Sequence, residues 1–236
     1  MSKSWCARLP PEAGVIVVAA GRGTRFGTGL SKQFQLLGQS PVLLHAVRPF
    51  AAHPDVAHIV IVLSPEGAAA PPEWLLAVCG GRLTITAGGA ERQDSVGAGL
   101  AALPPTCSIV LVHDGARPFP SRAMIDGGIA SARRGRGAVP ALPVPETIKR
   151  ADDFGRVLST VDRQGLWCAQ TPQAFPRSVL ERAHTAARAE QFLGTDDAAL
   201  VERLGEPIDL LPGSPRNLKI TTPHDLALAA WYADRS

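Results

Sequence analysis

Short apolar runs alternate along the chain with longer stretches in which apolar residues recur at every third or fourth position. The short runs are typical of buried strands, and the periodic stretches are typical of helices with one buried face. We therefore predict strands at 15–20, 57–63, 83–87, 108–112, 138–142 and 207–211. We predict helices at 41–51, 92–103, 121–134, 177–190, 197–204 and 223–232. This alternation favours an α/β fold with a mostly parallel sheet covered by helices.

The stretch 143–167 breaks this alternation. Apolar and polar residues alternate there in two short runs, and a turn-forming segment rich in Asp and Gly lies between them at 152–155. The pattern predicts an antiparallel hairpin, which we call the β-arm. Because a lone hairpin buries little apolar surface, we expect the β-arm to need a partner surface, most simply that of an identical subunit.

Composition narrows the class of protein. The chain has 236 residues, of which 45% are hydrophobic and 19% charged, and its formal net charge is +3. This length fits one domain over 1–236 that includes the β-arm, and so small a charge predicts neither a nucleic-acid nor a membrane partner. The cysteines show no zinc-binding spacing, and no apolar run is long enough to span a membrane. We therefore expect free thiols at Cys6, Cys79, Cys107 and Cys168, and a cytoplasmic location.

A glycine-rich segment follows the first predicted strand. It reads Ala-Ala-Gly-Arg-Gly-Thr-Arg at 19–25 and leads to Ser-Lys-Gln-Phe at 31–34. Loops at the carboxyl ends of parallel strands bind ligands in open α/β sheets, and glycines let backbone N–H groups approach phosphate oxygens. Arg25 and Lys32 add positive charge, although the segment matches neither the dinucleotide fingerprint nor the P-loop. An ordinary strand-to-helix turn with two solvated cations stays open as the alternative.

The chain resembles the nucleotidyltransferases that activate sugar and polyol phosphates, through this Ala-Ala-Gly-x-Gly-x-Arg pattern and the Lys-Gln-Phe after it. Five later segments narrow the resemblance to the 2-C-methyl-D-erythritol 4-phosphate cytidylyltransferase family. They are Val-His-Asp-Gly-Ala-Arg-Pro at 112–118, Pro-Glu-Thr-Ile-Lys at 145–149, Gln-Thr-Pro-Gln-Ala-Phe at 170–175, Thr-Asp-Asp-Ala at 195–198 and Asn-Leu-Lys-Ile-Thr-Thr-Pro at 217–223. The resemblance implies a Rossmann-like three-layer nucleotidyltransferase fold, with a mostly parallel twisted sheet and a protruding β-arm.

The same resemblance implies a reaction between two polyanions. The phosphate of 2-C-methyl-D-erythritol 4-phosphate would attack the α-phosphorus of CTP and release pyrophosphate, in the non-mevalonate isoprenoid pathway. This nucleophile is already an anion, so no general base is needed. At about 4 Å, each pair of like unit charges costs roughly 4 kcal/mol at an effective dielectric constant of about 20. We therefore expect positioned cations, together with Mg²⁺ or another divalent cation, to dominate catalysis.

The resemblance also assigns roles to individual residues. The catalytic residues would be Arg25, Lys32 and Lys219. The nucleotide would be bound by Ala20, Gly21, Gly23, Gly88, Gly89, Ser95, Asp114 and Gly115, and Asp114 would also help to hold the metal. The acceptor would be bound by Arg117, Thr147, Lys149, Arg163, Thr171 and Thr195, of which the three β-arm residues would serve the neighbouring subunit of a homodimer. The residues themselves also allow Asp114 or Thr195 to be a helix N-cap, and the β-arm to be a solvated hairpin face.

Several positions depart from the family's usual pattern. Ser31 replaces a proline, Gly115 replaces an alanine, and Ala90 stands where an acidic residue is frequent. Ala90 therefore puts one nucleotide contact in doubt. Arg216 adds a charge to which the sequence gives no role.

Two other functions stay open from the sequence alone. One is a cytidylyltransferase for another polyol phosphate, such as ribitol 5-phosphate. The other is a non-catalytic nucleotide-binding module, against which Arg25, Lys32 and Lys219 argue. His113 is more typical of a structural residue at a strand end than of an acid or base.

Overall fold

One eight-stranded sheet forms the centre of the computed structural model, which describes residues 10–21 and 31–235. The strand order is β10-β7-β11-β6-β1-β4-β5, and β12 also pairs with β7. The strands are β1 (Ala13–Val18), β4 (Val56–Leu63), β5 (Leu83–Ala87), β6 (Ile109–Asp114), β7 (Gly137–Pro143), β10 (Trp167–Ala169), β11 (Gln173–Pro176) and β12 (Ile208–Pro212). Parallel pairing joins β6, β1, β4 and β5, so their carboxyl ends meet at one edge of the sheet.

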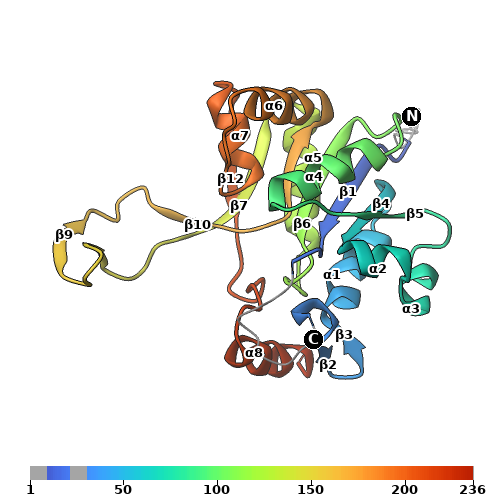
Figure 1. The fold of residues 1–236 in the computed structure, drawn as a ribbon, viewed down its shortest axis with the longest axis horizontal. Helices are drawn as coiled ribbons and strands as arrows, with labels where there is room; N and C mark the ends of the chain where they lie inside the picture. The colour runs from blue at the N-terminus through green and yellow to red at the C-terminus, as the bar shows by residue number, and fades with distance from the viewer. Residues whose placement is uncertain (1–9, 22–30, 236) are drawn as a thin grey trace, which may run out of the picture.

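Helices cover both faces of the sheet (Figure 1). Because neighbouring side chains of a strand point to opposite faces, Val15 and Val17 belong to one apolar cluster and Ile16 to the other. The first cluster is covered by α1 (Val42–Ala51), α3 (Glu73–Ala77) and α5 (Arg122–Arg133), and the second by α4 (Arg92–Ala102), α6 (Arg177–Ala189) and α7 (Asp197–Arg203). The expected three-layer α/β fold is therefore confirmed.

Shorter elements complete the body of the molecule. They are the 3₁₀ turn η2 (Lys32–Phe34), the small hairpin of β2 (Leu36–Leu37) and β3 (Ser40–Pro41), and the helix α2 (Pro65–Ala69). The last helix, α8 (Pro223–Ala233), begins at a capping box in which Thr222 and Asp225 satisfy each other's backbone N–H groups. Its Ala229 packs with Leu37 and Ile220 in a third apolar cluster. Among the helices of the described ranges, none has the length and apolar character required to cross a membrane.

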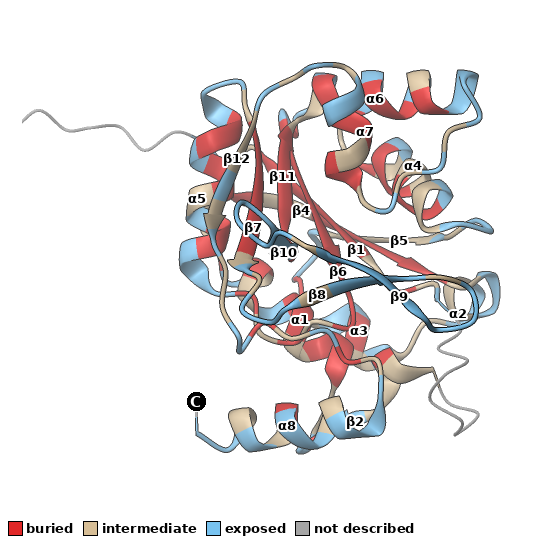
Figure 2. Cartoon of the chain, turned by 90° about the vertical axis from the view of Figure 1, so that its left-hand side faces the viewer, coloured by how far each residue is buried: buried red, intermediate tan, exposed pale blue. Residues whose placement is uncertain are grey.

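The β-arm leaves the body between the end of β7 and the start of β10. Its strands β8 (Ile148–Ala151) and β9 (Val157–Val161) pair antiparallel, as the sequence predicts (Figure 1). Most residues of the arm are exposed (Figure 2), and at its tip the Phe154 residue is 84% exposed. Val157 and Leu158 are also exposed, so the arm carries apolar side chains that its own chain leaves in contact with solvent.

Two strands of the sheet lie outside the predicted elements. The short β11 lies antiparallel between β6 and β7, and β10 pairs antiparallel with the end of β7. The predicted first strand, 15–20, is also displaced, because the observed β1 begins and ends two residues earlier. The free thiols expected at Cys79 and Cys107 are buried, whereas that of Cys168 is exposed on β10, and Cys6 lies outside the described residues.

Candidate active site

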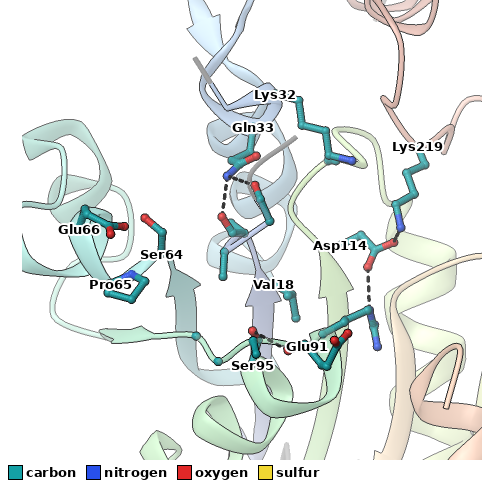
Figure 3. Close-up of a pocket in the computed structure, with 18 residues that line it drawn as sticks. Val18, Lys32, Gln33, Ser64, Pro65, Glu66, Glu91, Ser95, Asp114 and Lys219 are labelled. Carbon is teal, nitrogen blue, oxygen red and sulfur yellow. Dashed lines mark hydrogen bonds and ion pairs between the residues drawn. The ribbon is translucent and has the colours of Figure 1, made fainter. Parts of the chain in front are cut away.

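A cavity of about 760 Å³ lies at the carboxyl ends of four neighbouring parallel strands. Val18 ends β1, Ser64 follows β4, Gly88 follows β5, and Asp114 ends β6. This edge is where open α/β sheets bind ligands. Figure 3 shows Lys32 and Lys219 reaching toward the cavity from separate segments of the chain. The complete lining is Val18, Ala19, Ala20, Gly21, Lys32, Gln33, Ser64, Pro65, Glu66, Gly88, Gly89, Ala90, Glu91, Arg92, Ser95, Asp114, Ala116 and Lys219.

Gly88 and Gly89, which follow β5, lie so close to neighbouring residues that neither position has room for a side chain. A Cβ atom on Gly88 would lie 2.6 Å from both the Ala20 Cβ and the Ser95 Oγ, and one on Gly89 would lie 2.4 Å from the Asp94 Cβ. The Ser95 hydroxyl donates a hydrogen bond of 3.2 Å to the Glu91 carbonyl. The close packing brings the backbone of the glycine segment to the cavity wall, where N–H groups can meet a ligand.

Gln33 fixes the backbone of residues 19–21, which directly follow β1. Its buried amide donates hydrogen bonds of 2.6 Å to the Ala19 carbonyl and 3.2 Å to the Gly21 carbonyl. These bonds hold the end of β1 against η2, whose first residue is Lys32. Sequence reasoning gave Gln33 no role, and its place beside Lys32 in the motif was the signal that could have found it. Gly23 and Arg25, which the resemblance assigns to the nucleotide site, lie outside the described residues.

Three cations surround the Asp114 carboxylate. Lys219 Nζ lies 2.9 Å from Oδ2, Arg92 Nε lies 3.4 Å from Oδ1, and Arg117 Nε lies 3.6 Å from Oδ2. Burial alone would raise the pKa of Asp114, but Lys219, Arg92 and Arg117 outweigh it and hold the pKa well below its usual range. Asp114 is therefore an anion at neutral pH, and the cluster has a surplus of positive charge.

The segment that carries Lys219 is tied to the end of β6 by its backbone. Arg117 donates a hydrogen bond of 2.7 Å to the Asn217 carbonyl, and the Ile220 N–H donates one of 2.9 Å to the Ala116 carbonyl. The buried Asn217 amide also donates to the Thr171 carbonyl at 2.8 Å. These bonds on both sides of Lys219 explain how a residue near the end of the chain reaches Asp114.

Some predicted ligand-binding residues do not line the cavity but form hydrogen bonds with residues that do. Thr171 is buried, and its hydroxyl accepts a hydrogen bond of 3.0 Å from the Asp114 N–H. Gly115 donates its N–H to the Val18 carbonyl at 2.9 Å, and a Cβ atom there would lie 3.0 Å from the Ala19 Cβ. Neither Thr171 nor Gly115 lines the cavity, and Arg117 does not line it either. Their direct roles toward nucleotide or acceptor stay predictions.

Both N-cap alternatives are wrong. Asp114 does not cap the next helix, because α5 begins at Arg122 and its N-cap is Ser121. Thr195 does not cap α7 either, because the neighbouring Asp196 accepts the hydrogen bond from the Ala199 N–H. Thr195 itself is exposed.

The three β-arm residues of the predicted acceptor site lie apart from the cavity. Thr147, Lys149 and Arg163 are exposed, and none of them lines the cavity of its own chain. Lys149 donates a hydrogen bond of 2.6 Å to the Thr160 hydroxyl, and Arg163 donates to the Pro145 carbonyl. The structure of one chain therefore does not bring these residues together with Lys32 and Lys219.

The surroundings of Asp114 do not fit a metal held by protein ligands alone. Three cations lie within 4 Å of this carboxylate, and they would repel a divalent cation. Among the residues that the structure describes, no group of His, Cys, Asp and Glu side chains has the arrangement of a metal site. Asp114 and its neighbours therefore do not form a metal site of their own.

Arg92 is a cavity residue that sequence reasoning missed. It is the first residue of α4 and pairs both with Asp114 and, at 2.7 Å, with Asp197. These two carboxylates outweigh burial and raise the pKa of Arg92, so the guanidinium stays charged. The available signal was its position three residues after Gly89, at the start of a predicted helix.

Lowering the pH is expected to destabilise the fold through His113. Burial lowers the pKa of this histidine to about 4, and its Nε2 donates a hydrogen bond of 2.9 Å to the Arg117 carbonyl. Because the folded pKa lies below the unfolded value of about 6.5, the stabilisation is complete above that pH and is lost as the pH falls toward 4. Between pH 7.5 and 5.0 this one group removes about 2 kcal/mol of unfolding free energy.

Urea unfolding at the two pH values measures this loss. His45 and His58 act in the same direction, since burial lowers the pKa of each. The variant His113→Gln should therefore show a smaller, but not zero, loss. An equal loss in the variant and the wild type would refute the assignment to His113.

Comparisons with known proteins agree over nearly the whole chain. A sequence model of the family described as 2-C-methyl-D-erythritol 4-phosphate cytidylyltransferase matches residues 13–235. A protein of that description from Symbiobacterium thermophilum is 46% identical over 224 residues, which cover 94% of this chain and 92% of that protein. The crystal structure of 2-C-methyl-D-erythritol 4-phosphate cytidylyltransferase from Thermus thermophilus has a TM-score of 0.78 and 35% identity, covering 93% of this chain and 98% of that one. The crystal structure of 4-diphosphocytidyl-2C-methyl-D-erythritol synthase from Anaerococcus prevotii has a TM-score of 0.81 and 28% identity, covering 94% and 98%.

Proposed function

This chain belongs to the 2-C-methyl-D-erythritol 4-phosphate cytidylyltransferase family, and we propose that it transfers the cytidylyl group of CTP to 2-C-methyl-D-erythritol 4-phosphate. The products are 4-diphosphocytidyl-2-C-methyl-D-erythritol and pyrophosphate, in the non-mevalonate isoprenoid pathway. The observation that carries the proposal is the family match over residues 13–235. A cavity with Lys32 and Lys219 in its lining, at the ligand-binding edge of the sheet, is consistent with it.

The reaction exchanges one phosphoanhydride for another. An oxygen of the acceptor phosphate forms a bond to the α-phosphorus of CTP. The bond from this phosphorus to the oxygen that bridges to the β-phosphate breaks, and pyrophosphate leaves with the electron pair. Because the attacking oxygen is already ionised, the protein needs to position the reactants and offset their charge rather than remove a proton.

The cavity residues suit that task. We propose that the backbone around Gly21, Gly88 and Gly89 receives the nucleotide, and that Lys32 and Lys219 hold its phosphates. The role of Arg25 in the same cluster stays a proposal from the resemblance. His113 is outside the cavity lining and its pKa of about 4 keeps it neutral, which supports a mechanism without a histidine base.

We place the divalent cation with the nucleotide. Mg²⁺ prefers oxygen ligands and binds commonly to substrate phosphates, and the cations around Asp114 make that carboxylate a poor ligand for it. In this proposal Mg²⁺ enters as part of the CTP substrate. We also propose a cytoplasmic location, in keeping with the buried free thiols Cys79 and Cys107.

We propose that the chain acts as a homodimer in which each β-arm serves the neighbouring acceptor site. The exposed apolar side chains of Phe154, Val157 and Leu158 support a protein partner for the arm. Arg163 suits an acceptor phosphate because its planar guanidinium donates two parallel hydrogen bonds. One chain alone does not bring Arg163 to the cavity, and a second copy would supply it.

A charge at the tip of the β-arm is expected to break this assembly. The double variant Phe154→Asp, Leu158→Asp replaces exposed apolar side chains, so the body should keep its stability while the dimer dissociates. Turnover should fall by roughly 100-fold, because an acceptor that loses positioning groups reacts far more slowly. Light scattering and steady-state kinetics measure the two effects, and a dimeric, fully active double variant would contradict the proposed role of the arm.

Mixing two inactive variants tests the sharing of sites separately. Arg25→Ala removes a predicted catalytic cation, whereas Arg163→Ala removes the predicted contribution of the arm. Mixed dimers contain one site with neither change, so partial activity should return after subunit exchange. No recovery despite proven exchange would count against shared sites.

An acceptor panel with pyrophosphate detection tests the proposed function itself. Purified protein is incubated with CTP, Mg²⁺ and one acceptor at a time. We expect turnover with 2-C-methyl-D-erythritol 4-phosphate and little with ribitol 5-phosphate. Turnover of ribitol 5-phosphate alone would select the other polyol phosphate, and CTP binding without pyrophosphate release would select the non-catalytic module.

A further inference from the structure

Arg92 and Lys219 pair with different oxygens of the Asp114 carboxylate. Arg92 pairs with Oδ1 at 3.4 Å, whereas Lys219 pairs with Oδ2 at 2.9 Å. Figure 3 shows ion pairs leaving Asp114 in two directions, one of them to Lys219. The carboxylate therefore keeps a paired oxygen if either cation moves away.

The two cations differ in how firmly they are held. The Lys219 side chain is 41% exposed, while that of Arg92 is 28% exposed and that of Asp114 is 11% exposed. Arg92 is anchored at 2.7 Å by Asp197, whose side chain is only 1% exposed. A solvent-exposed lysine can exchange its partner for a ligand oxygen more readily than an arginine pinned between two carboxylates. Lys219 is therefore the most exposed cation of the cluster and the one with fewer carboxylate partners than Arg92.

Arg92 lies at an electrostatically unfavourable place for a positive side chain. It is the first residue of α4, and a positive side chain at a helix N-terminus is unfavourable because of the helix dipole. Asp114 and Asp197 offset this cost, and both lie on other segments of the fold. Such an arrangement points to a role in holding segments together rather than in forming the helix.

The anchor of Arg92 belongs to the acceptor side of the predicted site. Asp197 is the first residue of α7 and follows Thr195, which the resemblance assigns to the acceptor. Arg92 itself follows the glycine segment at 88–89 of the nucleotide cavity. On the far side of Asp197, its Oδ1 lies 3.4 Å from the His184 Nε2 of α6. The pair of Arg92 and Asp197 thus joins the segment after Gly88 and Gly89 to the start of α7, beside Asp114.

We propose that Arg92 is a positioning residue that keeps Asp114 paired while Lys219 transfers from Asp114 to the substrate phosphates. The inference rests on the proposed cytidylyltransferase function. Without Arg92, the departure of Lys219 would leave only Arg117, at 3.6 Å, beside a buried carboxylate, whose charge would then be poorly compensated. With Arg92 in place, Lys219 is available to the reaction.

Steady-state kinetics of three variants test this role. Arg92→Gln should lower kcat by roughly 10- to 100-fold, because Lys219 stays with Asp114, while the KM for CTP changes by less than about 3-fold. Asp197→Asn should lower kcat in the same direction by releasing Arg92. The double variant should be no slower than Arg92→Gln, since both changes disrupt one linkage. Arg92→Lys should recover part of the activity, because it restores the charge but not both contacts.

A matched pair outside the cavity serves as the control. Arg136 lies 2.6 Å from Asp209 near β12, so Arg136→Gln breaks an ion pair of similar length without touching the cavity. Thermal unfolding of each variant sets an assay temperature at which all are folded, and calorimetry measures CTP binding independently of turnover. Arg92→Lys keeps the test available if Arg92→Gln does not fold.

The outcomes separate the inference from the proposed function. A wild-type chain that releases no pyrophosphate with the acceptor rejects the function and the inference together. If the wild type is active, two results would overturn the inference alone. One is an unchanged kcat in Arg92→Gln. The other is a double variant in which the losses of Arg92→Gln and Asp197→Asn multiply. The inference would also be overturned if Arg92→Lys showed no recovery over Arg92→Gln.

Discussion

Lys32→Ala is expected to lower kcat by about 1000-fold, the largest effect that the structure predicts. Lys32 lines the cavity at the start of η2, next to Gln33, whose amide fixes the backbone of residues 19–21. A fixed ammonium group at this place offsets the charge that two reacting polyanions bring together, and such groups are worth about 100- to 1000-fold each in enzyme sites. We expect the upper end here, because the chemistry uses no base or nucleophile of the protein.

Pre-steady-state release of pyrophosphate measures this loss apart from product dissociation. Stability should change little, since Lys32 is only half-buried, and its removal leaves the Gln33 hydrogen bonds to Ala19 and Gly21 in place. Arg122→Ala is a suitable control, because the Arg122 side chain is 70% exposed and its pair with Asp126 lies outside the cavity. A near-normal rate in Lys32→Ala would remove this residue from the mechanism.

Lys219→Ala is the second large expected effect, a fall in kcat of about 100- to 1000-fold. Lys219 shares the cavity with Lys32 but belongs to the segment held by Arg117 and Asn217. The Asp114 carboxylate remains paired with Arg92 and Arg117 in this variant, so the chain should still fold. Loss of the exposed cation, rather than loss of structure, then accounts for the slower reaction.

The variant Lys219→Arg separates charge from geometry at the same position. It keeps a positive group beside Asp114, but the guanidinium is larger and less mobile than an ammonium group. We expect intermediate turnover, measured at saturating CTP and acceptor. Equal, severe losses of stability in Lys219→Ala and Lys219→Arg would instead make Lys219 a structural partner of Asp114.

The sheet could be predicted from the sequence where strands are long and buried. The apolar runs of β4 and β6 indicate strands because both of their faces are covered by helices. The central strand β11 could not be found in this way, since Gln173–Pro176 is four residues long and begins with a glutamine. That glutamine is buried because its amide donates a hydrogen bond of 2.6 Å to Asp196. Such tertiary pairing leaves no periodic signal in the chain.

In the candidate site, too, the sequence predicts some features, while others depend on tertiary contacts. Its glycine segments could be predicted, because glycines after strands at one sheet edge permit close backbone approach, and Gly88 and Gly89 are packed in that way. The resemblance supplied Lys32, Lys219 and Asp114 as separate residues. It did not supply their geometry: the pairing of Asp114 with Lys219 and Arg92 depends on how distant segments meet. The pair of Arg92 and Asp197 was missed for the same reason.

The most direct test is a crystal structure of the wild-type protein with a non-hydrolysable CTP analogue, Mg²⁺ and 2-C-methyl-D-erythritol 4-phosphate. We expect the Nζ atoms of Lys32 and Lys219 to lie about 3 Å from phosphate oxygens of the two ligands. We also expect Arg92 to remain in contact with Asp114. Both ammonium groups directed away from well-ordered phosphates would contradict the claim that fixed cations of this cavity bring the two anions together.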